Sequence, residues 1–323
     1  MDISVIIPAF NRPQALERTL QGLAKQTVPA ERFEVLVVDD GSTDEGIQAL
    51  AHRQWPYPLQ VLRQSRSGPG AARNRGVQES HGGLLVFLDA DMIPDADLIQ
   101  AYSAAHATQS RAVLVGRQQP WSPAFTSRFD QIFNYVAIGD LGSSPRICEF
   151  YHLASGNFAV ARETLALLNG FDEQLLMCED TDLGYRVLLQ GIALRYAPAA
   201  VGYHNHPKTL AELCDWQHAS ARWTAHLIHK HPQIIGQLPV YREVEPIFLG
   251  QDSARLVLRK VARRVLAAPP ALALLEVAAS LFERISPIPA LLRSLYFKIL
   301  TSHRLRGFRQ GLADLQRQAT DGN

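Results

Sequence analysis

Cysteine is scarce in this sequence, with three residues in 323. Cys148, Cys178 and Cys214 are odd in number and lie 30 and 36 residues apart. This spacing fits neither a disulfide framework nor a Cys-x-x-Cys zinc site. We therefore expect a protein of the reducing cytosol.

The sequence also lacks an excess of charge of either sign and a long apolar run. The 32 Lys and Arg residues against 31 Asp and Glu residues leave a net charge of +1, and no recognition motif for DNA or RNA is present, so we expect no nucleic-acid partner. The first residues form neither a basic segment nor a long apolar one, which predicts no signal peptide. The longest uncharged apolar run of the C-terminal part, residues 265–275, is interrupted by two prolines, so a transmembrane helix is not expected.

What the sequence does contain is an alternation of short β-branched runs with helical segments in its first half. Residues 3–7, 35–38, 59–62 and 84–88 read as strands, and amphipathic or helix-forming stretches separate them. Further along, residues 192–196 read as a short strand that ends at Pro198. Asn11 before Arg12 and Pro13 predicts a capped helix start. The fold class is therefore predicted as α/β, with a mostly parallel central sheet flanked by helices and ligands at the carboxyl ends of the strands.

From Thr209 onward the pattern becomes helical. We predict a catalytic domain over residues 1–206, with a nucleotide-binding half at 1–116 and an acceptor half at 117–206, followed by a helical C-terminal region at 207–323. Residues 255–309 hold eleven Lys and Arg residues against two Glu residues, a balance of +9. Such helices either lie on an anionic membrane, at the inner face of the cell membrane where a lipid-linked acceptor would be presented, or pack on the catalytic domain or a second subunit as in a homodimer.

Three acidic clusters follow predicted strands or open a predicted helix. Asp39 and Asp40 follow the second strand, residues 89–91 (Asp-Ala-Asp) follow the fourth, and Glu179, Asp180 and Asp182 open a later helix. For any single cluster, capping of backbone N–H groups is as good an explanation as ligand binding. Several clusters together favour a cation or a ligand rich in hydrogen-bond donors, because like charges repel, and Asp-x-Asp suits Mg²⁺ or Mn²⁺.

Ordered motifs surround these clusters. They are SVIIPAFNR at residues 4–12, VVDDGSTD at 37–44, GPGAARNRG at 68–76, and then GNF, GFDE, ED and YHNHP between residues 156 and 207. In this order they closely resemble the family-2 glycosyltransferases, over residues 3–206. The resemblance implies the GT-A nucleotide-binding fold, a nucleotide-diphospho-sugar donor and a divalent cation, Mn²⁺ or Mg²⁺.

The resemblance also assigns residues to the donor. Asp40 would accept a hydrogen bond from the nucleotide base, Arg73 would approach the nucleotide, Asp89 would face the ribose and Asp91 would bind the metal on the diphosphate. The full nucleotide-sugar set implied is Pro8, Ala9, Phe10, Arg12, Asp39, Asp40, Arg73, Asp89, Ala90 and Asp91.

On the acceptor side the resemblance implies contacts from Gly156, Asn157 and Glu179. Asp180 would be the general base, with Glu179 as the second choice. His204 would complete the metal site with Asp91, and the neighbouring His206 competes for that role.

These expectations combine into an inverting, metal-assisted transfer of a sugar to an acceptor hydroxyl, with Asp180 as base. An acidic residue at the base favours UDP or dTDP donors, and GDP remains compatible. Two alternatives stay open: a sugar-1-phosphate nucleotidyltransferase, whose N-terminal Gly-rich loop is missing at residues 8–11, and a non-catalytic scaffold that binds sugar nucleotides, against which the intact Asp91 and Asp180 argue.

Overall fold

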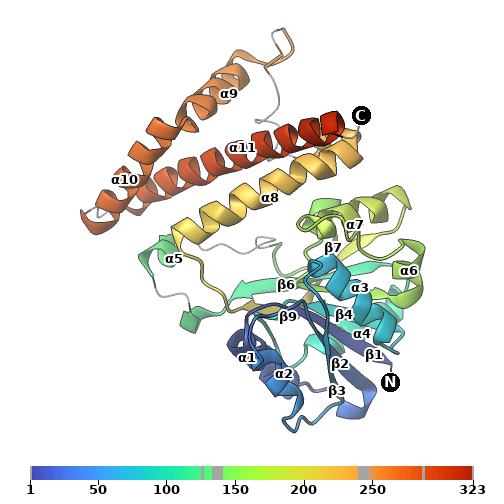
Figure 1. Cartoon of the computed structure of the whole chain (residues 1–323). Helices are drawn as coiled ribbons and strands as arrows, with labels where there is room; N and C mark the ends of the chain where they lie inside the picture. Colours follow the sequence, from blue (N-terminus) through green and yellow to red (C-terminus); the bar gives the residue numbers. More distant parts are fainter. Residues whose placement is uncertain are drawn as a thin grey trace. The chain divides into compact units, whose positions relative to one another are not determined.

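The computed structural model describes residues 2–124, 127–132, 141–238, 247–248, 250–285 and 288–321 (Figure 1). The described residues form two compact units. One draws on residues 1–124 and 135–206, and the other on residues 125–134 and 207–323. The short helix α5 (Arg128–Ile132) therefore groups with the helical unit, although it precedes residue 206 in the sequence.

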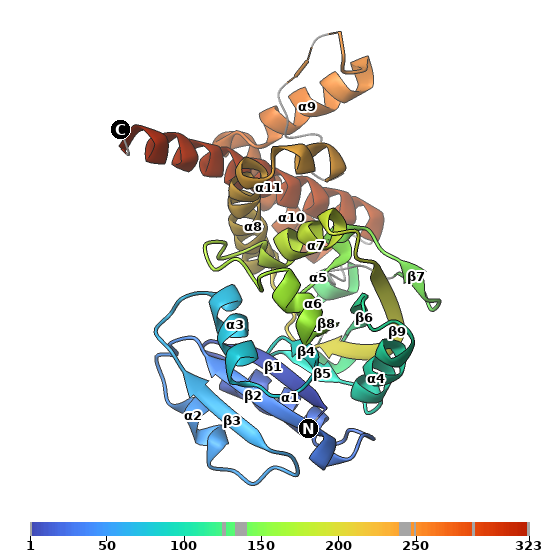
Figure 2. The same ribbon diagram turned by 90° about the vertical axis from the view of Figure 1, so that its right-hand side faces the viewer.

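The first unit begins with four parallel strands in the order β3-β2-β1-β4 (Figure 2). They are β1 (Ile3–Ala9), β2 (Phe33–Asp39), β3 (Leu59–Arg63) and β4 (Leu84–Leu88). The helices α1 (Pro13–Leu23), α2 (Gly46–Ala51) and α3 (Pro69–Glu79) connect them. The alternation of strands and helices in the first half of the sequence is confirmed, and the carboxyl ends of these strands share one edge.

Beyond β4 the sheet continues through β8 (Asn157–Ala161), β6 (Val113–Pro120), β9 (Leu194–His204) and β5 (Met92–Pro94), and β7 (Arg146–Ile147) pairs with β9. The predicted α/β class is confirmed, but the sheet is mixed, because β8 runs antiparallel to both of its neighbours, β4 and β6.

Strand β9 is longer than the sequence predicts. A proline cannot donate to a sheet ladder, so Pro198 suggested the end of a short strand. The structure places a register shift there: Gly116 of β6 pairs with Ala197, and the next residue, Arg117, pairs with Val201. The irregularity lets the strand pass Pro198 and continue to His204, which brings the histidine motif to the sheet edge.

The core lies on both faces of the sheet. Along β1, Val5 and Ile7 belong to one buried cluster and Ile6 to the other, so the strand reads as a continuous apolar run. Phe87 and Phe158 stack in the second cluster with ring centroids 4.6 Å apart. Further helices are α4 (Leu98–Thr108), α6 (Arg162–Leu167) and α7 (Glu179–Leu189), with short 3₁₀ segments at Ala30–Arg32, Ser122–Ala124 and Phe150–His152.

The second unit is helical, as expected from Thr209 onward. Its helices are α8 (Leu210–Lys230), α9 (Ala254–Leu266), α10 (Pro269–Ile285) and α11 (Pro289–Asp321), with a 3₁₀ segment at Pro232–Gln237. Helix α8 begins with a capping box of Thr209 and Glu212 and packs along α11 (Figure 1). In the described part of the chain no single helix is long and apolar enough to cross a bilayer. Among the described helices, the pair α9 and α10 taken together meets that test, and the two are bent by 83°.

Candidate active site

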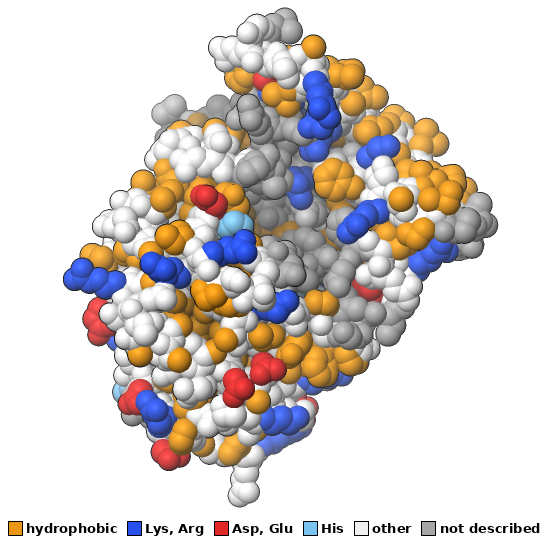
Figure 3. All heavy atoms as spheres, turned by 180° about the vertical axis from the view of Figure 1, so that it is seen from behind, with side chains coloured by type: hydrophobic (Ala, Val, Ile, Leu, Met, Phe, Trp, Pro, Cys, Tyr) orange, Lys and Arg blue, Asp and Glu red, His pale blue; other side chains and the backbone are white. Residues whose placement is uncertain are grey.

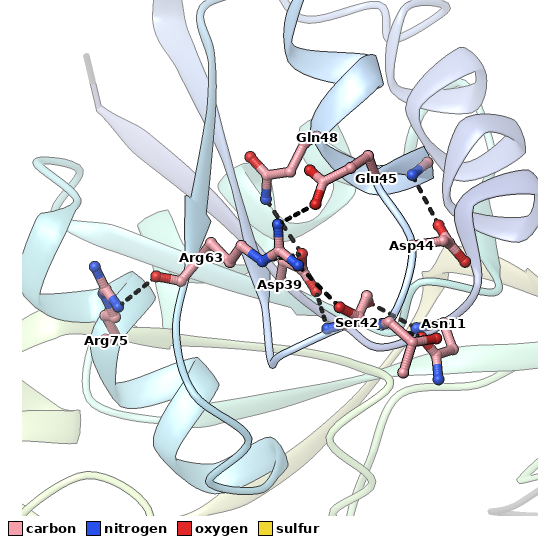
Figure 4. A network of polar contacts seen from close by, with 10 residues as sticks. Asn11, Asp39, Ser42, Asp44, Glu45, Gln48, Arg63 and Arg75 are labelled. Atoms are coloured by element: carbon pink, nitrogen blue, oxygen red, sulfur yellow. Dashed lines mark hydrogen bonds and ion pairs between the residues drawn. The ribbon is translucent and has the colours of Figure 1, made fainter.

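The turn after β2 is held by Asp39, whose side chain is fully buried (Figure 4). Its Oδ1 accepts from the Ser42 amide at 2.9 Å, and its Oδ2 accepts from the Gln48 side chain at 3.2 Å. The Arg63 guanidinium lies 3.7 Å from the same carboxylate. Asp39 thus shapes the loop after β2, and its own oxygens are enclosed by the protein.

Asn11 ties the turn after β1 to this loop (Figure 4). Its φ of 52° lies in the left-handed region, which Asn tolerates better than most residues. Its backbone amide donates to the Ser42 hydroxyl at 2.9 Å, and its side-chain oxygen accepts from the Thr43 amide at 2.9 Å. The prediction that Asn11 caps α1 is therefore wrong: the cap position is Arg12, and no side chain caps it.

Asp40 holds the loop at residues 64–68. Its carboxylate accepts from the amides of Ser67 and Gly68 at 2.8 and 2.9 Å and from the Gln64 side chain at 2.9 Å. A carboxylate has about four acceptor positions, so three protein bonds leave about one for a ligand. Hydrogen bonding to a donor base stays a prediction for Asp40.

The same loop carries Arg66, which no motif in the sequence indicated as a site residue. Its guanidinium carbon lies 3.9 Å from the centroid of the Phe10 ring, a close cation–π contact. Gly41, with a φ of 80°, allows this approach, because a Cβ there would lie 2.8 Å from the Arg66 amide nitrogen. The motif predicts Phe10 as a nucleotide-sugar residue, whereas its stacking partner from a distant loop has no signal in the sequence.

Arg73 of α3 joins the acidic clusters at Asp89 and at Glu179. Its side chain is buried, and it donates to Asp89 at 2.8 Å and to Glu179 at 2.7 Å. Gly156 lies against the other oxygen of Asp89, because a Cβ at that position would be 2.6 Å from Oδ2. The two acidic clusters are thus brought together by one guanidinium, and the contact of Arg73 with the nucleotide stays a prediction.

Asp91 lies beside His204 because β5 and β9 pair antiparallel with Met92 opposite His204. The His204 Nε2 is 3.8 Å from Asp91 Oδ1. Arg12 donates to Asp91 Oδ2 at 2.5 Å, and its other terminal nitrogen is 3.3 Å from the His206 ring. Among the described residues no group of three or more His, Cys, Asp or Glu side chains is arranged to hold a metal ion.

Glu179 and Asp180 open helix α7, after Cys178 in the left-handed region with a φ of 68°. Glu179 is buried, and burial raises its pKa to about 7, with the charge of Asp180 acting in the same direction. Asp180 is half-buried and accepts from the Thr181 amide at 2.7 Å and the Ser155 amide at 3.4 Å. Burial raises the pKa of Asp180 as well, and the Arg73 charge opposes that rise.

The Asn157 side chain forms hydrogen bonds with groups of and beside the sheet. Its side chain is buried, accepts from the Tyr102 hydroxyl at 2.8 Å and donates to the carbonyls of Arg117 and Ala200 at 3.0 Å each. These bonds span the register shift in β9. Asn157 therefore supports the sheet, and its contact with an acceptor stays a prediction.

The remaining residues predicted to bind the donor contribute mainly backbone groups to the described contacts. Ala9 is buried at the end of β1, and its carbonyl accepts from the Asp40 amide at 2.8 Å. Ala90 is buried, and its carbonyl accepts from the Thr19 hydroxyl at 2.9 Å. Pro8 is half-buried in β1. All the residues singled out from the sequence therefore belong to one compact unit.

Comparison with known proteins gives a family for most of this unit. Residues 4–163 match the model described as Glycosyl transferase family 2. The chain is 28% identical over 233 residues to the Probable glycosyltransferase YdaM of Bacillus subtilis, over 68% of this chain and 54% of that protein. It is 28% identical over 273 residues to the Validoxylamine A glucosyltransferase of Streptomyces hygroscopicus subsp. jinggangensis, over 73% of this chain and 62% of that protein. The chain thus spans little more than half the length of these relatives.

Solved structures share the fold. The mannosyltransferase PcManGT of Pyrobaculum calidifontis, in complex with GDP-Man and Mn²⁺, has a TM-score of 0.61 at 19% identity, over 94% of this chain and 86% of that one. Residues 1–349 of S. aureus TarS in complex with UDP have a TM-score of 0.52 at 19% identity, over 96% and 92% of the two chains.

Proposed function

Because the chain belongs to glycosyl transferase family 2, we propose that it transfers a sugar from a nucleotide-diphospho-sugar to an acceptor hydroxyl, with inversion at the anomeric carbon. The observation that carries the proposal is the Arg73 bridge, in which one buried guanidinium holds Asp89 of the donor side and Glu179 of the acceptor side. Donor and acceptor groups at one edge of a sheet are what a direct transfer requires.

Asp180 acts as the general base in this proposal. Inversion needs one base to take the acceptor proton on the face opposite the leaving group. Asp180 is half-buried, whereas Glu179 is buried and bonded to Arg73, which favours Asp180 as the group that reaches a hydroxyl. Its raised pKa makes it a better proton acceptor than an exposed aspartate, and Glu179 then positions Arg73.

A divalent cation fits beside Asp91 and His204, because a carboxylate and an imidazole are ligands that Mn²⁺ accepts. The Asp91 carboxylate already holds a cationic group, the Arg12 guanidinium. Two protein ligands leave other coordination positions to the donor diphosphate and water. When bound, the ion would offset negative charge on the departing diphosphate. Arg12, which contacts Asp91, would supply a second positive group beside the ion.

For the donor base we propose the surface formed by Phe10 and Arg66. A planar base stacks on aromatic rings and guanidinium planes alike, and the Asp40 clamp on residues 64–68 keeps Arg66 over Phe10. The named complexes of the solved relatives contain UDP or GDP-Man, which supports a uridine, thymidine or guanosine diphosphate carrier.

A screen of thermal stability tests the donor class. The full chain would be heated with UDP, dTDP, GDP or CDP, each with and without Mn²⁺. We expect at least one of the first three to raise the melting temperature, more strongly with Mn²⁺, because a ligand that binds only the native state stabilises it. No shift with any nucleotide would contradict the proposal.

A further inference from the structure

Helix α10 is apolar on its outer side as well as its inner side. Leu272 and Ala279 are buried against the helical unit. On the outer side Leu274 is 72% exposed, and Val277 and Leu281 are exposed at positions three and seven residues further on, which form one stripe of the helix. Helices that are apolar all round are normally buried, so this stripe needs a cover.

Helix α9 repeats the arrangement. Leu258 is 69% exposed, and Val261 and Val265 are exposed three and seven residues further on. The opposite side carries Lys260, which is buried and pairs with Asp252 at 2.8 Å. Two consecutive helices thus present apolar stripes to solvent, a pattern that scattered surface leucines do not give.

Exposed cations lie on α9 and on α11, which packs against both α9 and α10. Arg255 and Arg259 are exposed on α9, as are Arg293 and Lys298 on α11. The only acidic residues between positions 254 and 298 are Glu276 and Glu283. Seen from behind, hydrophobic side chains gather over this part of the helical unit with Lys and Arg side chains among them (Figure 3).

We propose that α9 and α10 dock on the surface of an anionic lipid bilayer, with Leu258, Leu274 and Leu281 entering the acyl boundary and the exposed arginines meeting the headgroups. Amphipathic helices with leucines on one face and basic side chains beside it bind membranes in this way, and the long arginine stems let the charge stay at headgroup level. Helix α9 has five Lys and Arg residues among its 13. Because charged side chains are costly in the bilayer interior, a position along the surface has a lower free energy than one through the bilayer.

Charge favours a lipid surface over a second copy of the chain. In a symmetric dimer the same patch meets itself, so the arginines of two α9 helices would approach one another and repel. Anionic headgroups instead supply the opposite charge. Each Lys or Arg near such a surface strengthens binding about fivefold, from a contribution of about 1 kcal/mol.

The test is sedimentation of the full chain with vesicles, in the absence of donor and acceptor so that its outcome is independent of catalysis. Vesicles of phosphatidylcholine with about one third phosphatidylglycerol are compared with phosphatidylcholine alone. We expect binding to the anionic vesicles, at least tenfold weaker binding to the neutral ones, and a loss of binding as salt is raised, since screening weakens the headgroup contacts (about 10 Å Debye length at 0.1 M).

Two double variants separate the apolar and charged contributions. Leu274→Glu with Leu281→Glu should weaken binding to anionic vesicles by at least about tenfold. Its matched control is Leu167→Glu with Leu189→Glu, in the other unit, where Leu167 is 61% exposed.

Arg255→Gln with Arg259→Gln should weaken binding about twentyfold or more at low salt. Arg18→Gln with Arg111→Gln, both exposed in the other unit, is its control.

Three results would overturn the proposal. The first is that the full chain does not sediment with anionic vesicles. The second is that Leu274→Glu with Leu281→Glu binds these vesicles as well as its leucine control. The third is a dimer, found by light scattering, that Leu274→Glu with Leu281→Glu dissociates without changing vesicle binding. This result would assign the apolar face to contact with a second copy.

Discussion

Two neighbouring carboxyl groups, Glu179 and Asp180, differ at the residue scale in what surrounds them. Glu179 lies in the interior and faces the Arg73 guanidinium. Asp180 is held by the amides of Ser155 and Thr181 and keeps part of its surface open. The sequence makes both residues candidates for the general base, and the difference in their burial distinguishes between them.

Replacing each carboxyl by its amide distinguishes their roles. Asp180→Asn removes the proton acceptor with little change in size, so turnover should fall about 100-fold or more while donor affinity persists. Glu179→Gln should cost less, because the amide still accepts from Arg73. Steady-state kinetics and donor titration measure both effects. Weaker donor binding with unchanged turnover in Asp180→Asn would make Asp180 a binding residue.

The pH dependence of activity follows from the same pair. Burial raises the pKa of Asp180 above its usual 3.8, so the proton-accepting form is lost at a higher pH than for an exposed aspartate. We expect kcat/KM to decline as pH falls through this raised pKa, in a pH profile measured over about pH 4 to 9. A flat profile down to pH 4 would contradict a base in this environment.

Stability should respond to pH in the opposite sense at Glu179. Its pKa rises from 4.5 to about 7 on folding, so its contribution to the free energy of unfolding is fully present below pH 4.5 and is lost as pH rises through about 7. Urea unfolding at several pH values should find less loss over this window in Glu179→Gln than in the wild type. Parallel pH curves for the two proteins would show that Glu179 does not titrate in this way.

Arg12 and a metal ion should compete for Asp91. The guanidinium bonds to Asp91 at 2.5 Å, so Arg12→Ala should tighten Mn²⁺ binding to the donor-free protein by about tenfold, and Asp91→Asn should abolish it. Titration of Mn²⁺ followed by electron paramagnetic resonance measures this without turnover. Arg32→Ala, which removes an exposed ion pair with Asp2, is the control. Unchanged Mn²⁺ affinity in Arg12→Ala would place the ion elsewhere.

At the scale of elements, Arg73 links α3 to α7 and to the loop after β4. Arg73→Ala should lower the free energy of unfolding by about 3–5 kcal/mol, because it leaves two carboxylates around a buried gap. Arg75→Ala on the same helix removes a bond to the Arg63 carbonyl at the surface and should cost under about 1 kcal/mol. Urea unfolding compares the two. Equal losses of unfolding free energy would mean that the Arg73 bridge contributes no more to stability than the surface bond of Arg75.

The elements that sequence predicted well are those with strong local patterns. Residues 84–88 form a strand with the predicted bounds, and α7 begins at Glu179 as predicted, because apolar periodicity and acidic first turns are local signals. The continuation of β9 past Pro198 depends on a register shift against β6, which local pattern does not contain. The stacking of Arg66 on Phe10 depends on how Asp40 folds a loop, and is equally non-local.

At the scale of the whole molecule, the charge is divided along the chain. Residues 255–309 sum to +9 within a total of +1, so the rest sums to −8. The sequence alone therefore predicted a basic helical region and left membrane and protein packing equally open. The exposed stripes of α9 and α10, which only the structure shows, favour the membrane, and so does the repulsion expected between two copies.

Consumption of nucleotide sugars tests the central claim most directly. UDP-, dTDP- and GDP-linked sugars would be incubated with the full chain and Mn²⁺, with and without a chelator, and the nucleotide product identified by mass spectrometry. We expect release of the nucleoside diphosphate from one of these donors, with water taking the sugar in place of the acceptor hydroxyl, at least about 100-fold slower in Asp180→Asn. Formation of a nucleoside triphosphate and a sugar phosphate when pyrophosphate is added, or tight donor binding without any consumption, would contradict the proposed transfer.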